Sequence, residues 1–149
     1  MTSRNFSQLT GMVFTLVGLL GFVPGLISSP PTDYPRLLVN EGYGLLLGLF
    51  PVNAIHNLVH LGIGITGWYS SRTMPAARLY ARGLTMFYGG LAIIGLFPVL
   101  NTIFGLIPLF GHDIWLHAGT AAAAAYFGFG VLEEAWEPTE QSGQYRRAA

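Results

Sequence analysis

The sequence contains no cysteine and no lysine, and it has few charged residues of either sign. Without cysteine, disulfides, thiolate metal sites and cysteine nucleophiles are excluded. Only 9% of the 149 residues are charged, against about 25% in an average soluble domain, and 52% are hydrophobic. Seven arginines balance seven acidic residues, so the net charge gives no reason to expect nucleic acid as a partner. This composition predicts an integral membrane protein.

Long uncharged runs predict an all-α fold, because the chain has room for about four spanning helices of roughly 20 residues each. We expect these helices near residues 9–27, 53–69, 76–97 and 113–132. Together they predict a four-helix transmembrane domain over residues 1–132. The polar residues 133–149 predict a flexible cytoplasmic tail.

The segment between the first two predicted helices is interrupted by helix breakers. Pro30, Pro31 and Pro35 predict a loop, because proline lacks a backbone N–H and disfavours helical geometry before it. Glu41 and several glycines interrupt the apolar run 37–50, which we interpret as an interfacial or re-entrant segment.

Arginine placement predicts the orientation of the bundle. With four spans, Arg36 alone lies on one side, and the remaining arginines lie on the other: Arg4, Arg72, Arg78, Arg82, Arg146 and Arg147. Positive residues accumulate in cytoplasmic segments, so both termini are expected to be cytoplasmic.

A short internal repeat suggests that the chain is a duplicated helix pair. The sequence GLFP at residues 48–51 resembles GLIP at residues 105–108. The same offset places His60 on His117, at matching depth in two parallel copies of the pair.

Four histidines, His56, His60, His112 and His117, fall near the predicted outer face of the bundle. One interpretation is structural, with the histidines hydrogen-bonded across helices. A second is a haem or chlorophyll held between His60 and His117. A third is a transition-metal ion held by His56, His60 and either His112 or His117, since His56 and His60 share one helical face.

Other polar residues would support such a site. Asp113 or Glu41 is a candidate carboxylate ligand or a partner of a ligating histidine. Asn53 and Asn57 lie beside the first two histidines, and Asn53 is suited to cap the helix that follows it.

The motif PVNAIHNLVHLGIGITG, Pro51 to Gly67, resembles the signature of a family of small bacterial four-helix membrane proteins that is catalogued only as a domain of unknown function. The resemblance implies the fold over about residues 9–132 and a location in a bacterial plasma membrane or thylakoid. It carries no activity, cofactor or catalytic residue.

These observations predict a small non-enzymatic membrane protein, a subunit or binding module with a histidine-rich site on its outer face. Its expected partners are membrane lipid and either copies of itself or a larger membrane complex. The alternatives are a haem- or chlorophyll-binding redox or photosynthetic accessory protein, and a membrane metal-binding oxidoreductase.

Overall fold

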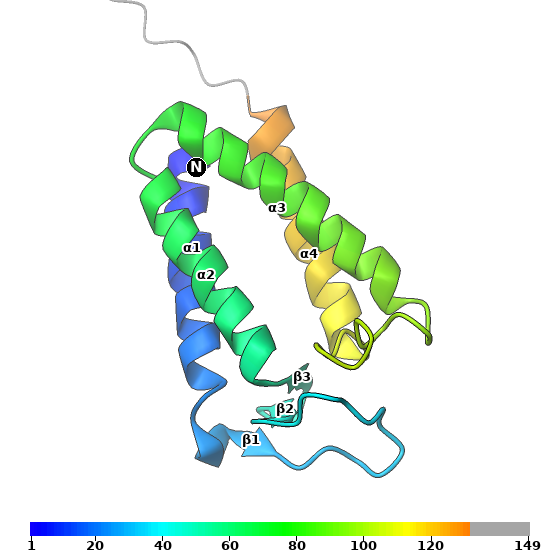
Figure 1. Ribbon diagram of the computed structural model, residues 1–149. Helices are drawn as coiled ribbons and strands as arrows, with labels where there is room; N and C mark the ends of the chain where they lie inside the picture. The colour runs from blue at the N-terminus through cyan, green and yellow to red at the C-terminus, as the bar shows by residue number, and fades with distance from the viewer. Residues whose placement is uncertain (132–149) are drawn as a thin grey trace, which may run out of the picture.

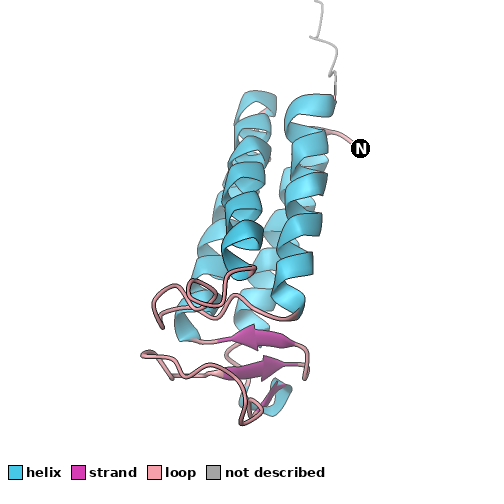
Figure 2. Ribbon diagram, turned by 90° about the vertical axis from the view of Figure 1, so that its right-hand side faces the viewer, coloured by secondary structure: helices cyan, strands magenta, loops and turns pink. Residues whose placement is uncertain are grey.

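The computed structural model describes residues 1–131 as a bundle of four helices with a small sheet across one end (Figures 1 and 2). This confirms the predicted four-helix, mostly helical architecture. The predicted tail, residues 133–149, lies outside the described residues. The helices are α1 (Ser3–Leu20), α2 (Ala54–Ser70), α3 (Met74–Gly95) and α4 (His112–Ala125), and α4 continues as a π-helical turn, Tyr126–Gly130.

The boundaries of α1 differ most from those expected from the sequence. The helix begins at Ser3, because the Thr2 side chain accepts the Asn5 N–H (3.2 Å) and so caps the first turn. It ends at Leu20, shortly before a 3₁₀ turn at Pro24–Leu26. The apolar residues after Leu20 therefore belong to the connection that follows the helix.

The prediction of an all-α fold is wrong between α1 and α2, where the chain forms a three-stranded antiparallel sheet. The strands β1 (Ile27–Ser28), β2 (Gly44–Leu46) and β3 (Phe50–Val52) are ordered β1-β2-β3, with Ile27 opposite Leu46 and Leu45 opposite Pro51. These strands are too short to show the alternation of apolar and polar residues that predicts a strand from sequence. Gly44 allows β2 to pair closely with β1, because a Cβ at this position would collide with Ile27 and Ser28 of β1.

The helices associate mainly as two pairs, α1 with α2 and α3 with α4 (Figure 1). Glycines bring α1 and α2 into backbone contact: a Cβ on Gly64 would lie 2.9 Å from the Gly11 carbonyl oxygen, and one on Gly67 would lie 2.9 Å from the Gly11 Cα. In the other pair, Ala81 of α3 and Ala124 of α4 are completely buried. Small residues thus permit close approach within each pair.

The start of α1 and the end of the described chain lie at the same end of the bundle (Figure 1). The Ser3 hydroxyl donates a hydrogen bond to the Phe127 carbonyl (2.9 Å), and Arg4 Nε donates one to the Ser71 carbonyl (2.8 Å). Arg82 Nε donates to the Gly128 carbonyl (2.9 Å) in the π-helical turn. The sheet and the first turn of α2 lie at the opposite end.

Judged by length and hydropathy together, none of the helices in residues 1–131 qualifies as a membrane span. The four helices are confirmed, whereas their predicted transmembrane character gains no support from this criterion.

Asn53 links three segments at the sheet end of the bundle. Its side-chain oxygen accepts the His56 N–H (3.0 Å) and caps α2. Its side-chain nitrogen donates to the carbonyls of Val39 (3.0 Å) and Leu106 (2.7 Å). Asn53 is completely buried, so its polar side-chain atoms need partners within the protein, and these three hydrogen bonds supply them.

Replacing Asn53 by alanine is therefore expected to destabilise the protein by about 3 kcal/mol, from about 1 kcal/mol for the cap and about 1 for each further hydrogen bond. Asn53→Ser keeps a capping oxygen but loses the two bridges, so we expect a smaller loss of about 2 kcal/mol. Thermal unfolding measures both variants. Equal stability of the alanine variant and the wild type would contradict this role.

Candidate metal site

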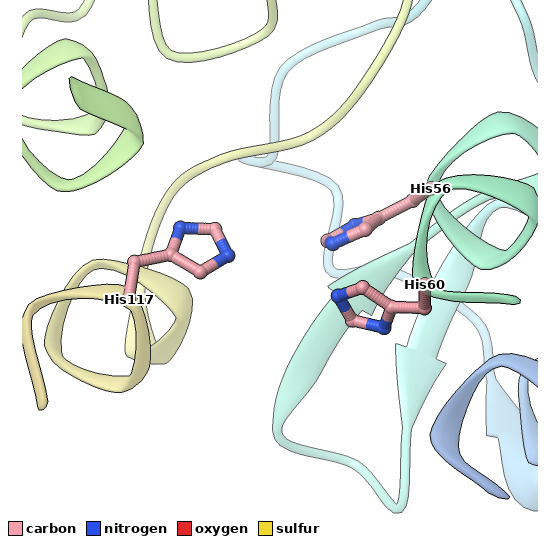
Figure 3. A group of neighbouring side chains, drawn as sticks. All are labelled: His56, His60 and His117. Carbon is pink, nitrogen blue, oxygen red and sulfur yellow. The ribbon is translucent and has the colours of Figure 1, made fainter. Parts of the chain in front are cut away.

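Three buried histidines converge at the end of the bundle that the sheet covers. One ring nitrogen from each of His56, His60 and His117 lies within 4.8 Å of the other two. Figure 3 shows the His117 ring directed from α4 towards the rings of His56 and His60 on α2. Within residues 1–131, this is the one group of three or more potential metal-ligating side chains.

The local structure explains how these side chains meet. The Asn53 cap fixes where α2 begins, and residues four apart on a helix lie on one face, so the rings of His56 and His60 lie close together, with centroids 4.6 Å apart. On the other side, α4 starts directly after Gly111, whose φ of 66° is a conformation that favours glycine. The His56 and His117 ring centroids are 6.3 Å apart.

A buried carboxylate accompanies the histidines. Asp113 is 2% exposed, and its Oδ2 lies 3.8 Å from His56 Nδ1. Within the described residues, this oxygen and the Nδ1 atoms of all three histidines are buried without a hydrogen-bond partner. Buried polar atoms normally have partners, so this concentration of unpaired atoms indicates a ligand site.

Aromatic rings separate the histidines from the rest of the core. The ring centroid of Phe14 lies 5.5 Å from that of His60, and the centroid of Tyr88 lies 5.1 Å from that of His117. Phe14 and Tyr88 stack on each other at 5.2 Å. Sequence reasoning missed Tyr88, although it lies at helical spacing from Ala81 and Leu84 on the buried face of α3.

Two cavities adjoin the histidine cluster, and His56 and His60 line both. The smaller, of about 190 Å³, is also lined by His117 and Tyr88 together with residues of the connection between α3 and α4. The larger, of about 540 Å³, lies between α1 and α4 and reaches Asp113. A ligand at the histidines would therefore be accessible from two sides of the bundle.

The remaining predicted site residues have different positions. His112 is exposed, with its ring 6.4 Å from the Phe50 ring, and it lies outside the histidine group. Glu41 is also exposed, and its backbone carbonyl accepts the Ala54 N–H (2.8 Å). Asn57 donates to the Gly21 carbonyl (2.7 Å) and so joins α2 to the end of α1. Asn53 and Asn57 thus support the site by holding α2 in place.

Backbone features recur at the spacing of the sequence repeat. Leu47 and Gly48 have φ values of 53° and 73°, and 57 residues later Phe104 and Gly105 have φ values of 57° and 84°. The shared offset relates His60 of α2 to His117 of α4 and His56 to Asp113. Each half of the chain therefore contributes two polar side chains, four residues apart, to the region of the histidine cluster and Asp113.

The position of His56 bears on the choice of cofactor. Two axial histidines of a haem lie on opposite faces of the porphyrin, so the porphyrin plane separates their imidazole rings. Here the His56 ring lies 4.6 Å from His60 and 6.3 Å from His117, so three imidazoles surround one point. This arrangement suits a single metal ion better than a haem or chlorophyll between His60 and His117.

Comparison with known proteins gives a family but no activity. Residues 4–130 match the family described as Domain of unknown function (DUF4383). The chain matches no curated protein and no solved structure. The expectation of an uncharacterised domain family, drawn from the motif Pro51 to Gly67, is confirmed.

Proposed function

The chain belongs to the family described as Domain of unknown function (DUF4383), and from its histidine cluster we propose that it is a small, non-enzymatic metal-binding module embedded in a membrane. The observation that carries this proposal is the convergence of three imidazole nitrogens to within 4.8 Å. Nitrogen ligands at about 2.0–2.1 Å from a tetrahedral ion lie about 3.4 Å apart. Small rotations of the three side chains would bring the nitrogens from their present separation to the spacing that a tetrahedral ion requires.

The electrostatics of the site support a cation. Asp113 is the only buried acidic side chain in residues 1–131, and an unpaired buried carboxylate is costly. A divalent ion held by neutral imidazoles would supply the missing positive charge. Asp113 would then act as a partner of His56, since ligating histidines commonly hydrogen-bond a carboxylate through their second ring nitrogen.

The ligand type limits the choice of ion. Imidazole suits Zn²⁺, Cu²⁺, Fe²⁺ and Ni²⁺, whereas Mg²⁺ and Ca²⁺ prefer oxygen. Three histidines leave one position of a tetrahedral ion open for a further ligand. We therefore propose Zn²⁺ or a similar divalent ion, with His56, His60 and His117 as its protein ligands.

The distribution of apolar surface supports a membrane location. Large apolar side chains outside the cavity lining are exposed along the bundle, among them Leu16 (56%), Ile65 (62%) and Met86 (76%). Charged side chains that are exposed or half-buried lie towards the two ends: Arg4, Arg72, Arg78 and Arg82 at one, and Asp33, Arg36 and Glu41 at the other. With 18 and 22 residues, α1 and α3 are about 27 and 33 Å long, close to the bilayer core of about 30 Å. This apolar surface would contact lipid, further copies of the chain or a larger membrane complex.

The recurrence at an offset of 57 residues relates α2 and the turn before it to α4 and the turn before it, which supports a duplicated origin of these segments. We propose that α1 with α2 and α3 with α4 are two copies of one helix pair, and that the metal site lies where the copies meet. This arrangement explains why His56 and His60 on one side face Asp113 and His117 on the other.

A single preparation tests both parts of the proposal. Cell membranes containing the protein are washed at alkaline pH, extracted with detergent, loaded with Zn²⁺ and dialysed before metal analysis. We expect the protein to stay in the washed membranes and to retain about one ion per chain. Release of the protein by the wash would contradict the membrane location, and a metal content equal to that of the dialysis buffer would contradict the metal site.

A further inference from the structure

We propose that the larger cavity, between α1 and α4, binds a single-chain fatty acid whose carboxylate completes the coordination of the metal ion. This inference rests on the proposed metal site and names the ligand that would share it.

The cavity is elongated along the helices. Its lining residues follow α1 from Phe6 to Leu20 and α4 from Asp113 to Ala123. At 1.5 Å per residue, the α1 wall alone is about 21 Å long. The volume of the cavity is about 540 Å³. These dimensions suit one extended acyl chain.

The walls are apolar over most of this length. Phe6, Val13, Phe14 and Val17 line the α1 side, and Leu116 and Ala123 line the α4 side. The two helices make little direct contact with each other, since their main partners are α2 and α3 respectively. A hydrocarbon chain between them would cover apolar surface that the bundle leaves uncovered.

One end of the cavity is polar. His56, His60 and Asp113 line it there, next to Phe50 and Val52 of the sheet. A divalent ion with three neutral imidazoles and one buried carboxylate carries a net charge of +1. Burying that charge in an apolar cavity is unfavourable, and one monoanionic head group neutralises it. A carboxylate meets this need and also suits the open position on the ion.

The test uses the full chain in detergent, loaded with Co²⁺, because the visible spectrum of Co²⁺ reports its ligands. We expect palmitic acid to change this spectrum saturably, with one acid per chain and at least about 100-fold more tightly than acetate. Cetyl alcohol, which has the same chain without the charge, should leave the spectrum unchanged.

Two glycine variants locate the binding site. Gly119 lines the cavity, and a Cβ there would meet nothing within 4 Å, so Gly119→Leu adds a bulky side chain at the cavity wall from an unobstructed position. We expect at least a 10-fold loss of palmitic acid affinity with the Co²⁺ content unchanged. Gly90 of α3 is also open and lies outside the cavity lining, so Gly90→Leu should bind as the wild type does.

The outcomes separate the two proposals. A cobalt-loaded protein whose spectrum does not respond to palmitic acid overturns this inference and leaves the metal site intact, as does an undiminished affinity in Gly119→Leu. A protein that takes up no Co²⁺ by metal analysis overturns the metal site, and the inference with it.

Discussion

Replacing His117 by alanine is expected to weaken Zn²⁺ binding by more than about 100-fold, because it removes the only ligand that α4 contributes to the three-histidine group. Loss of a partner of a ligating histidine already costs about 10–100-fold, and loss of the ligand itself should cost more. Competition with a chromophoric chelator measures the affinity. Because the remaining two histidines both lie on α2, the variant also loses the metal-dependent link between the two helix pairs, so added Zn²⁺ should no longer raise its melting temperature.

His112→Ala is the matched control for this prediction. Both histidines belong to α4, but His112 is exposed and lies outside the group. Its replacement should leave the Zn²⁺ affinity within a factor of about two of the wild type, since a removed surface side chain changes little. Equal losses in the two variants would mean that the metal is bound elsewhere, and no loss in His117→Ala would exclude this residue as a ligand.

Gly64→Ala should reduce stability by about 2 kcal/mol, even though alanine favours helices by about 1 kcal/mol over glycine. The added Cβ would collide with the Thr15 backbone and lie 2.9 Å from the Gly11 carbonyl oxygen, so α1 and α2 would have to separate. His60, one helical turn earlier, would shift with α2 relative to His117. We therefore expect weaker metal binding together with a melting temperature lower by about 4–8 °C.

Gly62→Ala provides a control of opposite sign. Gly62 is exposed on the same helix, two residues away, and a Cβ there would meet nothing within 4 Å. Helix propensity then acts alone, and stability should rise by up to about 1 kcal/mol. Thermal unfolding in detergent measures the stability of both variants. If Gly62→Ala and Gly64→Ala change stability in the same direction, close α1–α2 contact does not determine the effect of Gly64→Ala.

Much of the site could be predicted from the sequence. The spacing of four residues places His56 and His60 on one helical face, and the offset of the repeat relates His60 to His117. Asn53 is predicted as a helix cap and has that role. The positions of these side chains depend only on helix periodicity, local capping and the spacing of the repeat.

The remaining features depend on how the helices are turned towards one another. His112 and His117 are five residues apart and so differ by about 140° around α4, and only the rotation of that helix decides which of them faces α2. The position of Tyr88 beside the site likewise requires the orientation of α3. The sheet gives no sequence signal because its strands have two or three residues, and the exposure of Glu41 on the loop is likewise set by the tertiary structure.

X-ray absorption spectroscopy at the zinc edge of the detergent-purified, Zn²⁺-loaded protein tests the central claim most directly. We predict an inner shell of light atoms at about 2.0–2.1 Å and outer-shell scattering that corresponds to three imidazole rings, reduced to two in His117→Ala. A shell without imidazole scattering, or an identical spectrum in wild type and His117→Ala, would contradict the three-histidine site.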